Sequence, residues 1–244
     1  MPNETTTCDF KFYGLIPGSL IDYPGMIAAT VFTIGCNFRC PYCQNRELAL
    51  AMKKSLSEYP QSLILNQIAG NSDSWIDGVC ITGGEPLLSS EIEAAIEQFK
   101  AAGLQVKVDT NGGFPKRLST LIDRGMVDYV AMDVKAPFTE EEYSKSIGVP
   151  AGKWLAAVRE SVDILKSGCI DAEFRTTCVP ALHTPDAIDR MARDIAPCKA
   201  YYLQRFRPHN TLDPAYEKVA EPKPQYMEKL LEVARQHVPP AQLR

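Results

Sequence analysis

"IAATVFTIGCNFRCPYCQN", residues 27–45, joins an apolar run rich in β-branched residues to a loop that carries three cysteines. The run at 27–34 has the composition of a buried strand. Cys36, Cys40 and Cys43 follow it within eight positions. The stretch therefore predicts a strand whose carboxyl end delivers three thiols to one loop.

Five more runs in the chain have the same strand-like composition, and helical patterns separate them. Strands are expected at 78–82, 104–110, 129–135, 172–179 and 200–206. Helices are expected at 61–70, 89–103, 115–125, 153–168, 184–196 and 223–238. Strands that alternate with helices predict an α/β fold of parallel βα units, closed or partly closed into a barrel.

Length, composition and charge exclude several classes of protein. With 244 residues, 45% of them hydrophobic, the chain can form one large core, and we expect a single domain over 1–244. The formal net charge of -4 comes from interspersed acidic and basic residues, which argues against nucleic acid or an anionic membrane as a partner. Neither a signal peptide nor a run of roughly 20 apolar residues is visible, so a cytoplasmic location is expected.

The chain has eight cysteines, and without a secretion signal they are expected to be reduced thiols. Five of them are scattered and are interpreted as structural residues: Cys8, Cys80, Cys169, Cys178 and Cys198. The other three are too closely spaced for a disulfide network, and thiolates grouped in a loop bind soft metals or iron–sulfur clusters. A zinc site would need a fourth ligand nearby, and none of the three histidines has a suitable spacing. We therefore favour a four-iron cluster with one iron left open, over zinc.

The residues with unusual chemistry follow the expected strands at their carboxyl ends. In chain order these segments read "GCNFRCPYCQN", "GGEP", "DTNGG", "DVKAP", "CVPALH" and "QRFRPHN". In barrels of βα units the functional face lies where strands end and the loops toward the helices begin. The sequence thus places nearly all of its candidate functional residues on one face.

Together these motifs resemble a known superfamily. Cys-x3-Cys-x2-Cys after a first strand, with Tyr42 before the last cysteine and "GGEP" after a second strand, closely resembles the radical S-adenosylmethionine (SAM) enzymes. Segment 19–45, "DTNG" and "DVKAP" are similar to the activating enzymes of glycyl radical enzymes, most of all the anaerobic ribonucleoside-triphosphate reductase activating proteins. The resemblance covers about 14–208, leaving a C-terminal helix and tail at 209–244. It implies a partial, TIM-like (β/α)6 barrel with a 4Fe-4S cluster that cleaves SAM reductively to a 5'-deoxyadenosyl radical.

The resemblance also implies roles for residues near the cluster. Cys36, Cys40 and Cys43 match the cluster ligands, and Tyr42 matches the aromatic position between them. The motif that is expected to bind the methionyl amino group of SAM consists of Gly83, Gly84, Glu85 and Pro86. Gln44 stands where many relatives carry histidine, which keeps a hydrogen-bond donor but loses a titrating group.

Further matches lie at the ends of the later strands. Asp109, Thr110 and Asp133 match positions that hold SAM and a monovalent cation in the pyruvate formate-lyase activating enzymes. The other residues expected to meet SAM are Asn111 beside them, Lys135 and Arg175 near the methionyl carboxylate, Val179 near the adenine, and Gln204 in place of a histidine.

The resemblance implies two protein partners: a glycyl radical enzyme as substrate, and a flavodoxin or ferredoxin-type electron donor. Two alternatives stay open. One is a radical SAM enzyme that acts on a small molecule, such as the 7-carboxy-7-deazaguanine synthases. The other is a non-enzymatic iron–sulfur or zinc protein, which SAM binding would exclude.

Overall fold

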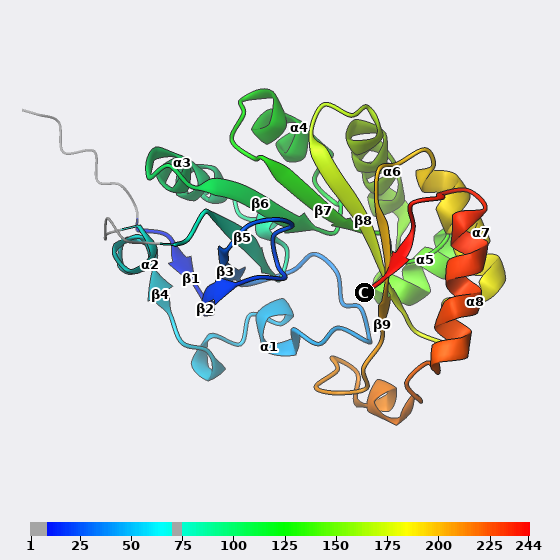
Figure 1. Cartoon of the computed structure of the whole chain (residues 1–244). Coiled ribbons are helices and arrows are strands. Elements are labelled where there is room, and N and C mark those ends of the chain that lie inside the picture. The colour runs from blue at the N-terminus through cyan, green and yellow to red at the C-terminus, as the bar shows by residue number, and fades with distance from the viewer. Residues whose placement is uncertain (1–8, 70–74) are drawn as a thin grey trace, which may run out of the picture.

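The computed structural model describes residues 9–69 and 75–244 and is built on one curved sheet (Figure 1). Six neighbouring parallel strands form its centre: β3 (Ala28–Thr33), β5 (Gly78–Gly83), β6 (Gln105–Thr110), β7 (Tyr129–Asp133), β8 (Asp171–Cys178) and β9 (Tyr201–Arg205). All six predicted strands are confirmed within one to two residues at each end. The six parallel strands with their crossover helices form the partial (β/α)6 barrel that the sequence predicts.

Two short strands extend the sheet at its edges. β2 (Leu15–Ser19) pairs antiparallel with β3, and β10 (Gln242–Leu243) pairs parallel with β9. The sheet order is β10-β9-β8-β7-β6-β5-β3-β2, so its first and last strands do not pair and the barrel stays open. A separate two-stranded sheet joins β1 (Lys11–Phe12) to β4 (Tyr59–Pro60).

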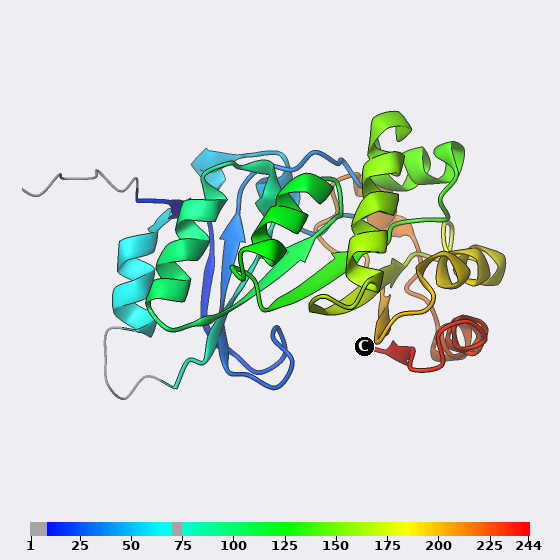
Figure 2. The ribbon, with the colours of Figure 1, turned by 90° about the horizontal axis from the view of Figure 1, so that it is seen from above.

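Helices cover the outside of the curved sheet (Figure 2). The six predicted helices are confirmed as α2 (Gln61–Ile68), α3 (Ile92–Ala101), α4 (Pro115–Asp123), α6 (Gly152–Lys166), α7 (Pro185–Ile195) and α8 (Pro224–Arg235). Each buries an apolar stripe; in α3 the stripe includes Ile92, Ile96 and Phe99. Short 3-10 helices occur at Lys53–Ser55, Pro86–Leu88 and Pro214–Lys218.

Two helices were not predicted, and both support the loop with the three cysteines. α1 (Arg46–Ala49) follows that loop directly. α5 (Glu140–Ile147) begins after Thr139, whose hydroxyl accepts from the Glu142 N–H, and ends at Gly148 with a left-handed backbone of φ 67°. The Ile147 carbonyl at the end of α5 accepts a hydrogen bond from the Arg39 N–H at 2.8 Å.

The described cysteines are all free thiols. Cys80 and Cys178 are buried, as expected for structural residues, whereas Cys198 is half-buried and Cys169 is exposed. Cys8 lies outside the described residues. Among the described helices, none has both the length and the apolar character required to cross a bilayer.

Candidate active site

A cavity of about 280 Å³ lies at the carboxyl ends of the parallel strands, the face that the sequence predicts. Most of the predicted site residues line it: Cys36, Cys40, Tyr42, Cys43, Gly83, Gly84, Glu85, Asp109, Thr110, Asn111, Asp133, Lys135, Arg175 and Gln204. Pro86 and Val179 are buried and do not line it. The fold thus brings together residues that are up to 168 positions apart, from Cys36 to Gln204.

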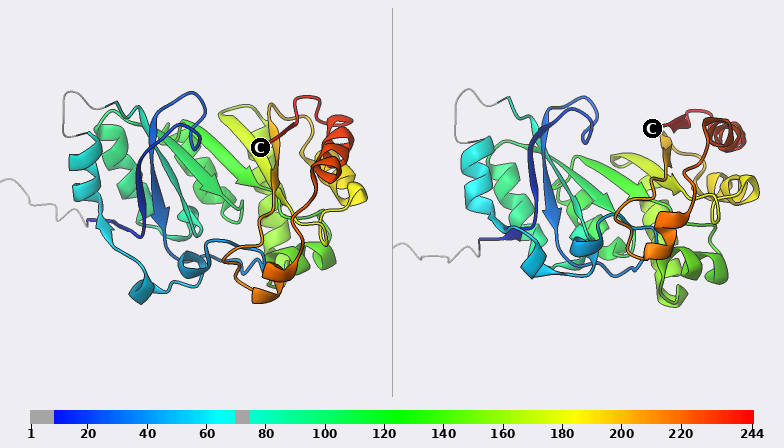
Figure 3. Two further views of the ribbon diagram at one scale, coloured as in Figure 1. Left: turned by 60° about the horizontal axis from the view of Figure 1, so that its bottom comes forward. Right: turned by 90° about the horizontal axis from the view of Figure 1, so that it is seen from below.

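One contact within the loop and contacts from two other segments fix the loop with the cysteines. Arg39 donates from its guanidinium to the Cys36 carbonyl at 2.6 Å, which closes the first half of the loop onto itself. The carbonyl of Ile147 holds the Arg39 backbone from α5. The carbonyl of Cys43 accepts from the Leu212 N–H at 2.9 Å, so the segment after β9 lies beside the second half of the loop (Figure 3). The loop is therefore held on both sides before any metal binds.

The three thiols are poor anions in the bare protein. Burial raises the pKa of Cys36 to about 11 and that of Cys40 to about 12, and it also raises the pKa of Cys43. Binding of iron to these sulfurs must therefore displace protons. Among residues 9–69 and 75–244, no three His, Cys, Asp or Glu side chains converge on a position for a single metal ion.

Two asparagines place amide groups beside the first cysteine. Asn111 Nδ2 donates to Asn37 Oδ1 at 2.8 Å and lies 3.7 Å from Cys36 Sγ. Asn37 Nδ2 is buried and has no hydrogen-bond partner in the described part of the chain. A buried N–H without a partner is costly. The amide of Asn111, by contrast, lies next to a sulfur that would become a better acceptor as a thiolate. The three soft sulfur donors and the Asn111 amide beside Cys36 fit an iron–sulfur cluster.

The "GGEP" turn packs directly against the loop with the cysteines. The Gly84 N–H donates to the Thr33 carbonyl at 3.0 Å, and the Glu85 N–H donates to the Gly35 carbonyl at 2.8 Å. A Cβ atom at Gly84 would lie 2.0 Å from the Gly35 oxygen. Glycine is therefore required here by the close approach of two backbones.

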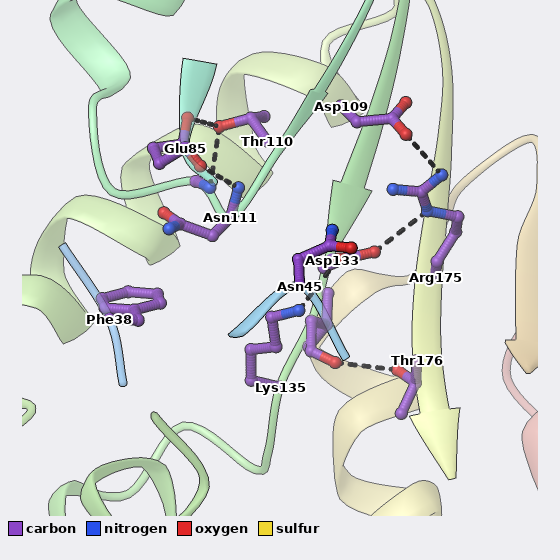
Figure 4. Close-up of polar contacts among 12 residues, drawn as sticks. Phe38, Asn45, Glu85, Asp109, Thr110, Asn111, Asp133, Lys135, Arg175 and Thr176 are labelled. Carbon is purple, nitrogen blue, oxygen red and sulfur yellow. Dashed lines mark hydrogen bonds and ion pairs between the residues drawn. The ribbon is translucent and has the colours of Figure 1, made fainter. Parts of the chain in front are cut away.

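Glu85 is buried with both carboxylate oxygens engaged (Figure 4). It accepts from the Leu87 N–H at 3.1 Å, the Thr110 hydroxyl at 2.7 Å and the Asn111 N–H at 2.7 Å. Burial outweighs these donors and raises the pKa of Glu85 to about 7. The carboxyl thus ties "GGEP" to "DTNG" and stands close to its point of protonation at neutral pH.

A network of ion pairs forms another wall of the cavity (Figure 4). Arg175 bridges two carboxylates: its Nη1 lies 3.0 Å from Asp109 Oδ2 and its Nε lies 2.9 Å from Asp133 Oδ1. Lys135 Nζ lies 2.8 Å from Asp133 Oδ2. Burial opposes the charge of Asp133, but Arg175 and Lys135 outweigh it and hold the pKa of this carboxyl below its usual range. Both cations remain on the cavity wall, where they can meet an anionic group.

The backbone of Lys135 is held by residues that surround Tyr42. Its carbonyl accepts from the Ser146 hydroxyl at 2.5 Å and from His183 Nε2 at 3.0 Å. The Tyr42 hydroxyl lies 2.9 Å from Ser146 Oγ, so Tyr42 is fixed through the same group. His183 Nδ1 accepts from the Val179 N–H at 2.9 Å, and the Val179 side chain is buried in the core. Burial lowers the pKa of His183 to about 4, so the ring is neutral at pH 7 and adds no charge to the site.

Several residues on the cavity wall were not singled out in the sequence: Phe38, Asn45, Ala49, Thr82 and Thr177. Thr177 was detectable, because it lies two residues after Arg175 and alternate residues of a strand share a face. Asn45 donates to the Gly83 carbonyl at 3.0 Å, a long-range contact that no local pattern signals. Gln44 also lines the cavity and donates to the Arg207 carbonyl at 3.0 Å.

Comparison with known proteins agrees with this geometry. A profile of the Radical SAM superfamily matches residues 30–195. A Methanocaldococcus jannaschii protein, provisionally named a glycyl-radical enzyme activating enzyme, is 30% identical over 227 residues, which cover 92% of each chain. A 7-carboxy-7-deazaguanine synthase of Thermoplasma acidophilum is 33% identical over 115 residues, 47% of this chain and 50% of that one. The structure of Streptococcus suis SuiB is similar in fold, with a TM-score of 0.64 at 12% identity over 88% of this chain and 48% of that one.

Proposed function

The chain belongs to the radical SAM superfamily, and from this we propose that it is the activating enzyme of a glycyl radical enzyme. Its substrate would be a glycine of a partner protein, of the anaerobic ribonucleotide reductase or pyruvate formate-lyase type. The observation that carries the proposal is the similarity to the M. jannaschii protein, because it extends over 92% of both chains. The matching part of the deazaguanine synthase stops at about half of each chain, which makes small-molecule chemistry the second candidate.

In this proposal the three thiols hold the cluster. Cys36, Cys40 and Cys43 would hold the irons and give up their protons on binding, while Asn111 offers an amide donor beside the first sulfur. Together with SAM, the bound 4Fe-4S cluster supplies the reductive cleavage of a carbon–sulfur bond to a radical that can abstract a hydrogen atom.

The rest of the cavity would orient SAM by charge. Lys135 and Arg175 offer cations to the methionyl carboxylate. Backbone carbonyls of "GGEP", beside the carboxyl of Glu85, suit the methionyl ammonium. None of these groups needs to transfer a proton for hydrogen-atom abstraction, which is consistent with the neutral, buried state of His183. The electron would come from a flavodoxin or a ferredoxin-type protein.

The test is anaerobic reconstitution with iron and sulfide, followed by reduction with dithionite in the presence of SAM. We expect 5'-deoxyadenosine from the wild type, measured by chromatography, and none above background from Cys40→Ala. Candidate glycyl radical enzymes are then added, and the glycyl radical is sought by electron paramagnetic resonance. A cluster that binds SAM without cleaving it would contradict the proposal, and multiple turnover of a small molecule without a partner protein would favour the second candidate.

A further inference from the structure

Lys107 is a buried lysine in the middle of a strand. It belongs to β6, whose neighbouring positions Val106 and Val108 are apolar, and its side chain is 2% exposed. Lysine is rarely buried to this degree unless it is paired. Its Nζ lies 2.5 Å from Asp109 Oδ1 and 3.6 Å from Cys80 Sγ. Because alternate residues of a strand share a face, Lys107 approaches Asp109 from the interior of the barrel, below the cavity.

With Lys107 included, every carboxylate oxygen of Asp109 and Asp133 has a cation of the protein beside it. Asp109 contacts Lys107 through one oxygen and Arg175 through the other. Asp133 contacts Arg175 through one oxygen and Lys135 through the other. Three positive side chains therefore face two negative ones, and this network carries no excess of negative charge.

The third group expected at a cation site points elsewhere. The Thr110 hydroxyl donates to Glu85, not toward the carboxylates. The oxygen atom of Thr110 also accepts from the Gly112 N–H at 3.2 Å, so it is engaged within the turn that follows β6. Asp109, Thr110 and Asp133 thus do not present a set of free oxygens to a metal ion, although the resemblance associates these positions with a monovalent cation.

We propose that Lys107 is a resident counter-cation, which replaces a bound monovalent ion in this site and makes the site independent of Na⁺ and K⁺. The assignment of the cavity to SAM rests on the proposed function, whereas the charge arrangement around Lys107 does not. A lysine can serve in this way because its ammonium is a compact point charge with three donors, comparable to a small ion.

This arrangement also explains how Lys135 becomes available to a ligand. The Lys135 side chain is 17% exposed and lies on the cavity wall, whereas that of Lys107 is sealed below it. If Lys135 turns from Asp133 to an anionic ligand, Asp133 keeps Arg175, and Asp109 keeps Lys107. Lys107 thereby allows Lys135 to leave Asp133 and meet the ligand. This is a positioning role, exerted through the carboxylates of Asp109 and Asp133.

The experiment compares thermal unfolding of the cluster-loaded protein in KCl, NaCl and tetramethylammonium chloride at one ionic strength, ~0.15 M. Tetramethylammonium controls for screening because it is too large to fit between side chains. We expect the wild type to unfold within about 1 °C in all three salts. Lys107→Met should unfold about 5 °C lower in tetramethylammonium and recover at least half of this difference in KCl or NaCl.

Two control variants separate this role from a general loss of stability. Lys107→Arg keeps the charge and should match the wild type in its indifference to the cation. Lys100→Met removes a lysine from another aspartate pair, with Asp128, and any loss should be equal in the three salts. A merely structural role of Lys107 would lower the unfolding temperature without any dependence on the cation.

Saturable stabilisation of the wild type by K⁺ or Na⁺ over tetramethylammonium would overturn the proposal, and this needs no variant. A folded Lys107→Met protein that shows no response to the cation would overturn it too; if Lys107→Met does not fold, Lys107→Gln takes its place. The unfolding assay does not require turnover of SAM. Failure of the proposed function would instead appear as absence of 5'-deoxyadenosine, so the two failures are distinguishable.

Discussion

The close approach of the "GGEP" turn to the loop with the cysteines makes Gly84→Ala the most incisive test of the architecture of the site. Its added Cβ would lie 2.0 Å from the Gly35 oxygen and 2.8 Å from the Gly35 carbonyl carbon. Ordinary contact begins at 3.4 Å, so the two backbones must separate by 1.4 Å, the difference between 3.4 and 2.0 Å. Neither obstacle is a flexible side chain that can turn away.

That separation breaks the contacts that join the two loops. The hydrogen bonds from the Gly84 N–H to Thr33 and from the Glu85 N–H to Gly35, at 3.0 and 2.8 Å, cannot both survive it. An N–H group that loses its partner in a buried place costs about 1–3 kcal/mol, so we expect a loss of roughly 2–5 kcal/mol in the free energy of unfolding. For a chain of this size this corresponds to a drop of about 10 °C in the unfolding temperature.

Two quantities are measured: the thermal unfolding temperature, monitored by circular dichroism under anaerobic conditions, and the iron content of the protein after reconstitution. Gly152→Ala is the matched control, because the nearest atom to its added Cβ is a carboxylate oxygen of Glu140 at 4.0 Å. This control should stay within about 0.5 kcal/mol of the wild type. If Gly84→Ala unfolds with the control and binds as much iron, the close packing of the two loops does not support the site and our reasoning is wrong.

Two further predictions concern buried titratable groups. Because the folded protein holds the pKa of His183 at about 4, below the ordinary 6.5, the unfolded state binds a proton more readily, and the contribution of His183 to stability falls as the pH drops from about 6.5 toward 4. The Glu85 carboxyl acts in the opposite direction over this range, because its pKa is raised to about 7 in the folded protein. Between pH 7 and pH 5 the wild type should therefore lose roughly 2 kcal/mol relative to His183→Gln in denaturant unfolding, since Glu85 contributes equally to both; parallel pH profiles of the two proteins would contradict this. Arg244→Ala should lower the free energy of unfolding by about 2 kcal/mol in urea, because Arg244 pairs at 2.9 Å with the fully buried Glu173. Arg193→Ala, which breaks an exposed pair with Asp189, should cost under about 1 kcal/mol, and an equal loss in both variants would refute the importance of burial.

The six parallel strands and six of the helices were predictable because each carries its own local signal. Strands such as β5 and β6 are buried on both faces and have the composition of apolar runs, and helices such as α3 carry an apolar stripe with a period of 3.6 residues. β10 has two residues and depends on pairing with β9, so no local pattern reveals it. α5 was missed because it is short and acidic, although its capping threonine and closing glycine are typical signals of a helix.

The candidate site was predictable to the extent that function is concentrated at strand ends. Residues such as Cys40, Glu85 and Asp133 reach one cavity because parallel strands end at one edge of the sheet. Val179 also follows a strand, yet its N–H is bound to His183 and its side chain lies in the core. The position of a residue at the carboxyl end of a strand gives the edge of the sheet on which it lies. The direction of its side chain depends on packing, which the sequence does not display.

Lys107 shows how much can be recovered from the alternation of a strand. In "LQVKVDT", lysine is the one charged residue within an otherwise apolar half-strand, and it precedes Asp109 by two positions. That spacing places both side chains on one face, and a buried lysine needs an anion within reach. These two facts alone predict the Lys107–Asp109 pair. They also imply that Asp109 is partly neutralised before a ligand arrives, so a residue matching a cation site cannot be assigned that role until the charges two positions away on its own strand are counted.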